Sequence, residues 1–227
     1  MKRFTRRVMR RLAAVHWSTW ALMIITLLAL VLRLQVVWND RGLAVPFGAR
    51  TDSGTYLNMA ESWSNKRSPT WFFFTPGYPA FLGFLMRLRL YLGIDSSLRV
   101  LAGLVQAVLG AWTVLLIGLL TRKRISALSG VLAALILTIW RGQVLGTTTL
   151  MTEPFFTPII WTAATLFLWS SKPSRPRLWS IGFLLAAAMM VRPTATPVLL
   201  VCMAVTCFRG TWLPRRRLSN AGLLLLG

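Results

Sequence analysis

The feature that most constrains this chain is a series of apolar segments long enough to cross a bilayer, separated by clusters of arginine and lysine. The first apolar segment covers residues 13–38, and at about 1.5 Å per residue it can cross a hydrocarbon core of about 30 Å. Charged residues make up only 14% of the 227 residues, whereas a soluble domain has roughly one quarter. The sequence therefore predicts an integral membrane protein.

The net charge of +21, from 26 Lys and Arg against 5 Asp and Glu, has two candidate explanations. In a soluble chain this excess would suggest a nucleic acid partner. Between apolar segments, however, basic clusters mark the cytoplasmic ends of spanning helices, so the lipid bilayer is the expected partner and nucleic acid is not. Cys202 and Cys207 lie in an apolar run without metal-ligand or disulfide-framework spacing and are interpreted as packing residues.

The N-terminal sequence MKRFTRRVMRR places basic residues before the first apolar segment. A cleaved signal peptide has an apolar core of roughly 7–15 residues, and this segment is longer. We therefore expect a retained anchor with a cytoplasmic N-terminus, in a multi-pass protein of the inner (plasma) membrane.

The later basic clusters, at residues 122–124, 172–177 and 209–217, limit how many segments cross the membrane. If all are cytoplasmic, spans between them come in pairs. Three crossings before residue 122 would break this rule, and the weakest candidate is the short segment 77–92, which contains Arg87 and Arg89. Arginine at mid-membrane costs about 2.5–3.5 kcal/mol, so we expect this segment to lie at the interface while residues 98–120 cross.

Residues 126–145 and 154–169 are predicted as the next pair of spans. Residues 179–208 contain Arg192-Pro193 near their centre. Proline interrupts a helix and arginine needs polar surroundings, so two short helices are expected to meet there on the outer side. This topology places all five acidic residues outside: Asp40, Asp52, Glu61, Asp95 and Glu153.

The predicted fold is an all-α, polytopic transmembrane helix bundle whose extracytoplasmic first loop, residues 39–92, carries juxtamembrane helices. Residues 1–227 are expected to form one transmembrane domain. After Arg217 the chain reads LSNAGLLLLG, which resembles the start of a further helix. Two interpretations stay open: an N-terminal fragment of a longer protein, or a segment that ends at the interface.

The first outer loop contains the residues best suited to chemistry. Tyr56, Met59, Ala60 and Trp63 recur at helical spacing, which predicts a short amphipathic helix on the membrane surface. Asp52 immediately precedes this helix and is predicted as its N-cap. Ser53, Asn58, Glu61 and Asn65 are expected on the other faces. A carboxylate held at a helix start is also oriented and accessible to a substrate, so the cap does not exclude a chemical role.

Three motifs in the chain together suggest a family. Asp52, Tyr56 and Ala60, followed by TPGYP at residues 75–79, resemble the first-loop signature of GT-C glycosyltransferases related to the aminoarabinose transferase of lipid A and to protein mannosyltransferases. The sequences TEPFF at residues 152–156 and VRPT at residues 191–194 agree with this resemblance.

The resemblance implies an integral membrane enzyme that transfers a sugar from a polyprenyl-phosphate carrier to an acceptor hydroxyl of a glycan, lipid or protein. Asp52 matches the first-loop aspartate that acts as general base. The departing lipid phosphate needs a cation, and Arg192 is the first candidate because an intramembrane arginine is costly unless it is paired. Two alternatives stay open for Arg192: a helix-end arginine that reaches the interface, or a partner of Glu153.

Other candidates have a structural interpretation beside the functional one. Arg50, Lys66 and Arg67 flank the surface helix and would bind the donor phosphate or, as we favour, anionic lipid headgroups. Tyr56 and Tyr78 are candidates to line the sugar pocket, although aromatic residues near an interface are more often membrane anchors.

Glu153 is a candidate for binding the acceptor or a divalent metal, or it is a structural acid at a helix start. With five acids in the chain, a dedicated metal site is not expected, and no cofactor is indicated. Ser53 follows Asp52 where protein mannosyltransferases have an Asp-Glu pair, which argues against protein O-mannosylation.

Two other classes of function remain open. A transporter or lipid flippase often contains broken helices and charged residues at mid-membrane, as at Arg192-Pro193. A non-catalytic assembly subunit becomes preferable if the chain truly ends at residue 227.

Overall fold

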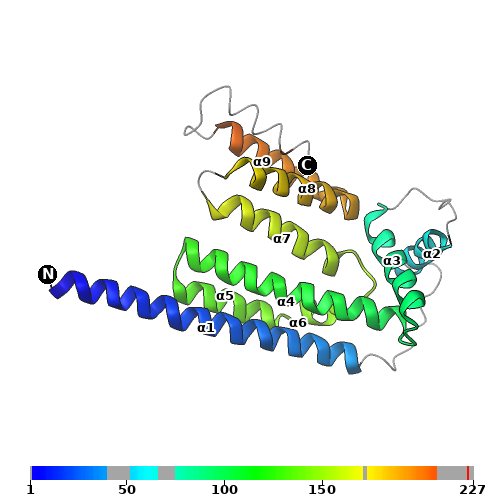
Figure 1. The fold of residues 1–227 in the computed structure, drawn as a ribbon, viewed down its shortest axis with the longest axis horizontal. Helices are drawn as coiled ribbons and strands as arrows, with labels where there is room; N and C mark the ends of the chain where they lie inside the picture. The colour runs from blue at the N-terminus through cyan, green and yellow to red at the C-terminus, as the bar shows by residue number, and fades with distance from the viewer. Residues whose placement is uncertain (1, 40–51, 66–74, 171–172, 209–223, 225–227) are drawn as a thin grey trace.

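The computed structural model describes residues 2–39, 52–65, 75–170, 173–208 and 224, and the regular structure of this part of the chain is entirely helical (Figure 1). The predicted all-α class is confirmed to that extent. In chain order the elements are α1 (Lys2–Asn39), α2 (Asp52–Ser64), α3 (Gly77–Leu92), α4 (Leu98–Arg124), α5 (Ala127–Ile139), α6 (Arg141–Leu145), the 3-10 helix η2 (Gly146–Thr148), α7 (Glu153–Trp169), α8 (Arg175–Val191), the 3-10 helix η3 (Pro193–Ala195) and α9 (Thr196–Phe208).

In the part of the chain that the structure describes, two helices are long and apolar enough to cross a membrane: Trp17–Asn39 of α1, and α4. A third span is possible if α5 and the α6–η2 segment count as one, although they are bent by 56° relative to each other. The bend occurs at Trp140, whose ψ of 106° is extended. The predicted span over residues 126–145 is therefore not one straight helix, because the helix breaks before Arg141.

Helix α1 packs antiparallel to α4 through the glycines of α4. A Cβ atom at Gly118 would meet Leu22, and one at Gly103 would meet Val37. Small residues let transmembrane helices approach closely, which favours their association. As a consequence, the apolar part of α1 begins beside the end of α4.

Among the residues that the structure describes, buried apolar side chains form three clusters. The first joins α1, α4 and α5 and includes Leu22 and Val114. The second joins α7, α8 and α9 and also buries Leu224. The third joins α2, α3 and α4 to Val191, the last residue of α8. This third cluster is the one that positions the candidate site.

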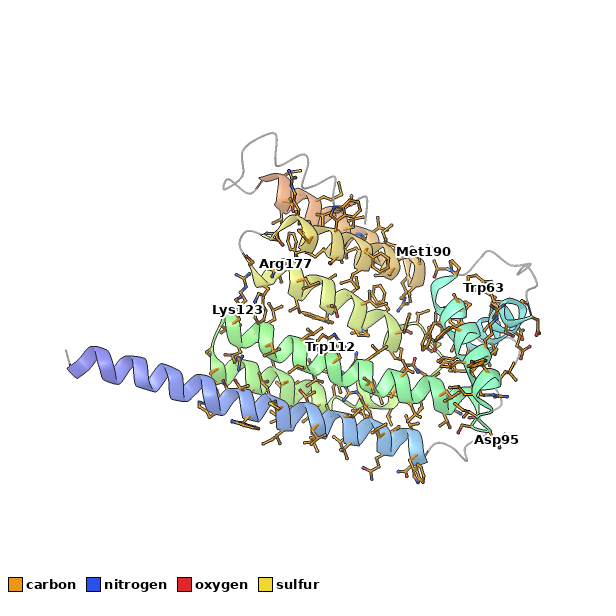
Figure 2. The ribbon with its side chains drawn as sticks, viewed as in Figure 1. Trp63, Asp95, Trp112, Lys123, Arg177 and Met190 are labelled. Atoms are coloured by element: carbon orange, nitrogen blue, oxygen red, sulfur yellow. The ribbon has the colours of Figure 1, made fainter. Side chains whose placement is uncertain are left out.

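The described residues of the basic clusters lie at one end of the bundle. Arg122 Nη1 donates to Thr19 Oγ1 at 2.7 Å, and Lys123 Nζ lies 4.0 Å from the centre of the Trp169 ring. Figure 2 shows Lys123 and Arg177 at this end. We call it the basic end; its residues are Arg122, Lys123, Arg124, Arg175 and Arg177.

The opposite end of the bundle carries α2 and α3, next to the end of α8 (Figure 1). Figure 2 shows Trp63, Asp95 and Met190 there. We call it the acidic end, because the four acids that the structure describes lie in α2, in the loop between α3 and α4, and at the start of α7: Asp52, Glu61, Asp95 and Glu153. Asp40 lies outside the described residues.

Two predicted breaks in the apolar segments match the structure. Helix α3 covers residues 77–92 and ends at Gly93, whose φ of 61° is the left-handed conformation that glycine adopts at helix C-termini. Helix α8 ends at Val191; Arg192 is extended, with φ −149° and ψ 125°, and Pro193 opens η3. The chain therefore turns at Arg192-Pro193, which puts this arginine at the acidic end.

Candidate functional site

Helix α2 presents an exposed acid and buries an aromatic face. It begins at Asp52, so this residue occupies the first turn instead of the position before the helix. Tyr56, Met59 and Ala60 are buried, as their spacing predicts. Ser53 was expected on another face but is also buried, because its hydroxyl contacts Met151 Sδ at 3.5 Å.

Arg87 of α3 holds the end of α2. Its Nη2 donates to the Trp63 carbonyl at 2.7 Å, and its Nε donates to the Ser64 carbonyl at 3.3 Å. The last carbonyls of a helix lack intrahelical partners and carry partial negative charge, so a cation there is favourable. The two helices thus form one unit, in which α3 sets the position of Asp52.

The TPGYP motif docks this unit onto the end of α8. The Thr75 hydroxyl donates to the Val191 carbonyl at 2.6 Å. Gly77 lies so close to α8 that a Cβ atom there would be 2.7 Å from the backbone carbon and oxygen of Met190. Only glycine allows this approach without a shift of one helix, and it places the first loop beside Arg192.

Aromatic side chains join the first loop to α7. Tyr78 is fully buried and its ring meets that of Tyr56 edge-on, with 5.4 Å between centroids. Phe81 stacks on Phe155 at 4.3 Å. Tyr78 therefore forms the wall behind Tyr56.

A buried amide on α4 completes this wall. Gln106 Oε1 accepts from the Tyr78 hydroxyl at 3.3 Å, while its Nε2 donates to the carbonyls of Thr147 at 3.0 Å and Thr149 at 3.3 Å. Gln106 is 1% exposed, so these bonds replace water. Gln106 is not among the site residues predicted from the sequence; its available signal was that of a single amide within the apolar segment 98–120.

The start of α7 brings an acid to Arg192. Glu153 Oε1 lies 2.8 Å from Arg192 Nη1, and the two side chains are 50% and 36% exposed. Glu153 Oε2 accepts from the Thr152 hydroxyl at 3.5 Å, and Thr152 also shares a side-chain hydrogen bond with Tyr56. The pairing of Arg192 with Glu153, one alternative from the sequence, is thus present.

Several of these groups influence the ionisation of Tyr56. Burial raises the pKa of Tyr56 above 10.0, and the charge of Asp52 raises it further. The Thr152 hydrogen bond opposes this rise, Glu153 adds to it, and Arg192 opposes it. Burial, Tyr56 and Glu153 raise the pKa of Tyr78 as well. Tyr56 is therefore a neutral hydrogen-bonding group between two carboxylates and a guanidinium at neutral pH.

The structure brings four predicted site residues together: Asp52, Tyr56, Glu153 and Arg192, with Tyr78 behind them. Arg50, Lys66 and Arg67 lie outside the described residues. Thr152 joins the cluster although it was quoted only as part of a motif; its signal was a hydroxyl directly before a helix-start acid. Among the residues that the structure describes, no three His, Cys, Asp or Glu side chains gather to hold a metal ion.

Comparison of the chain with protein-family models, with curated proteins and with solved structures gave no match. The chemistry of the site is accordingly interpreted from its own residues.

Proposed function

We propose that this protein is a membrane glycosyltransferase of the GT-C type, which transfers a sugar from a polyprenyl-phosphate donor to an acceptor hydroxyl. The observation that carries this proposal is the convergence of three distant motifs at the acidic end. Asp52 comes from the first, Glu153 from the second and Arg192 from the third, and all three act electrostatically on Tyr56.

Asp52 is the proposed general base. Its carboxylate is exposed in the first turn of α2, where an acceptor hydroxyl can reach it. In the proposed reaction it accepts the proton of the acceptor hydroxyl, whose oxygen then bonds to the anomeric carbon. The bond from that carbon to the phosphate oxygen breaks, and its electron pair leaves with the polyprenyl phosphate.

Arg192 is the proposed partner of that departing phosphate. Guanidinium groups bind phosphate through two parallel, charge-assisted hydrogen bonds. Preorganised cations at the position where charge develops stabilise a transition state. The extended backbone at Arg192 and the following Pro193 keep this side chain at the helix break, where its 36% exposure leaves it accessible.

The distribution of charge supports an extracytoplasmic site. Arginine and lysine are enriched on the cytoplasmic side of membrane proteins. This rule favours a cytoplasmic location for the basic end, which includes Arg122 to Arg124. The acidic end, with Asp52, would then lie on the extracytoplasmic side. Polyprenyl-linked sugars would be used there, at the headgroup level of the plasma membrane.

The test is sugar transfer by the purified chain in nanodiscs, with a radiolabelled polyprenyl-phosphate sugar and a mixture of membrane glycolipid acceptors. Asp52→Asn should lower the transfer rate by about 100-fold or more, because it removes the base. Glu61→Gln removes an exposed acid from the same helix and should leave the rate unchanged. Full activity of the Asp52→Asn variant would contradict the role of Asp52.

A lipid flippase or transporter is the second candidate, favoured by the broken helix at Arg192-Pro193. It would move lipid or solute across sealed vesicles without any change in covalent bonds. Transport without turnover of the donor would therefore select this function over the first.

A further inference from the structure

The cation of the candidate site already holds an anion. Among the residues that the structure describes, the one hydrogen-bonding partner of the Arg192 side chain is Glu153, through a single Nη1 to Oε1 contact of 2.8 Å. A guanidinium has five N–H donors in a planar fork. The carboxylate thus uses one nitrogen of a guanidinium group, which can bind an anion through two parallel N–H donors.

The pair is weak enough to exchange. Half of the Glu153 side chain and about a third of the Arg192 side chain are exposed, and exposed ion pairs contribute little because water competes for both charges. An arriving anion can therefore replace the carboxylate at small cost.

A phosphate group suits Arg192 better than the carboxylate does. It presents several oxygens and up to two negative charges to the fork of N–H groups. The Phe156 ring lies 6.0 Å from the guanidinium carbon and covers part of the site with apolar surface. An anion attached to a lipid chain would find both its headgroup and an apolar contact here.

Glu153 keeps other partners when it leaves Arg192. Its Oε2 is 3.5 Å from the Thr152 hydroxyl, and it stands in the first turn of α7, where the helix dipole favours a negative charge. Thr152 in turn contacts Tyr56. The released carboxylate is therefore held on the side of the site that carries Thr152 and Tyr56.

We propose that Glu153 is a placeholder for phosphate: the phosphate of a polyprenyl phosphate displaces the Glu153 carboxylate from Arg192, and Glu153 moves onto Thr152. The choice of lipid rests on the proposed function, whereas the exchange of phosphate for carboxylate rests on the ion pair alone. Binding of the lipid phosphate is thus coupled to the release of a second carboxylate into the site.

The experiment measures binding, not turnover, so that it stays informative if sugar transfer fails. Radiolabelled polyprenyl phosphate is titrated into the full chain in phosphatidylcholine nanodiscs. Glu153→Gln removes the competing charge and should tighten binding about two- to fivefold. Glu61→Gln, which removes an equal charge away from Arg192, should leave the dissociation constant unchanged.

Arg192→Met should weaken binding at least about tenfold, and the variant with both substitutions should bind no better than Arg192→Met alone. Glu153→Ala provides a second removal of the carboxylate if the glutamine variant is unstable. Inorganic phosphate and phosphatidylglycerol are tested as competitors of radiolabelled polyprenyl phosphate. Competition by inorganic phosphate alone assigns the site to free phosphate. Competition by neither compound assigns the site to the polyprenyl lipid. If both Glu153 variants bind polyprenyl phosphate no more tightly than the wild type does, the proposed exchange is wrong.

Discussion

The hydroxyl of Thr75 donates a 2.6 Å hydrogen bond to the carbonyl of Val191, a residue 116 positions further along the chain. This bond binds the last residue of α8, one residue before Arg192. It also fixes the start of α3, and α3 carries α2 with Asp52. The distance between the proposed base and the proposed phosphate ligand is therefore controlled at the contact between the TPGYP and VRPT motifs.

Substituting Gly77 should loosen that contact. In Gly77→Ala the new methyl group would lie 2.7 Å from the Met190 backbone, and such overpacking costs about 1–3 kcal/mol. We expect a lower unfolding temperature in detergent, followed by intrinsic tryptophan fluorescence. Gly146→Ala is the matched control, because nothing lies within 4 Å of a Cβ atom there. Equal unfolding temperatures for the two variants would show that α3 does not dock on α8 in this way.

Gln106 should be necessary for the stability of the wall behind the site. Gln106→Leu leaves the Tyr78 hydroxyl and two carbonyls of the η2 turn without their partner, at a cost of about 1–3 kcal/mol for a buried polar group. Thermal unfolding should detect this loss. Gln143→Leu, at an exposed glutamine, should have little effect.

A double-mutant cycle tests the network directly. If Gln106 stabilises the fold through Tyr78, the effects of Gln106→Leu and Tyr78→Phe should not be additive. Additive effects would mean that the 3.3 Å contact between these side chains contributes nothing.

Local patterns in the sequence predicted much of the fold. Helical spacing predicted the buried face of α2 at Tyr56 and Met59, and the Arg192-Pro193 pair predicted the break after α8. Both predictions succeed because apolar periodicity and proline act on the backbone within a few residues. The bend at Trp140 was missed, since no proline marks it. Ser53 was also misplaced, because its burial depends on Met151, which lies 98 positions away.

The candidate site was predictable as a set of motifs but not as a geometry. The family resemblance named Asp52, and the cost of a charge within the membrane selected Arg192. How these residues lie relative to each other depends on helix packing that no local pattern encodes. Thr152 and Gln106 were missed for the same reason: each matters because it joins two elements. Their roles become visible only when α3, α4 and α7 are placed together.

Tyr56 should make the stability of the fold depend on pH in the alkaline range. Burial, followed by the charge of Asp52, raises its pKa in the folded protein above the ordinary value of 10.0. A tyrosine with a raised pKa stabilises the fold fully below about pH 10, and this contribution is lost as the pH rises through the folded-state pKa.

Unfolding temperatures between pH 8 and pH 11 should therefore decline less in Tyr56→Phe than in the wild type. Tyr91→Phe is the control, because Tyr91 is 87% exposed. A decline in Tyr56→Phe as steep as in the wild type would show that Tyr56 is not buried among these charges.

Arg33 of α1 should be a destabilising residue. Its side chain is 1% exposed, and while Nη1 donates to the Ala29 carbonyl at 3.0 Å, the buried Nε has no partner in the described part of the chain. Arg33→Met should raise the stability by about 1–3 kcal/mol, because it removes a buried charge and an unsatisfied donor. Arg124→Met, at an exposed position, should change it little. A lower unfolding temperature for Arg33→Met would reveal a stabilising partner for this guanidinium.

The orientation of the bundle decides whether lipid-linked sugars of the outer leaflet can reach the site. In a background with Cys202 and Cys207 replaced by alanine, single cysteines at Asp95 and Lys123 report on the two ends, which lie at opposite sides of the bundle (Figure 2). Because basic clusters stay in the cytoplasm, a membrane-impermeant maleimide should label Asp95→Cys in intact cells. Lys123→Cys should react only after permeabilisation. The reverse pattern would place Asp52 in the cytoplasm, where a nucleotide sugar becomes the more suitable donor and the proposed reaction fails.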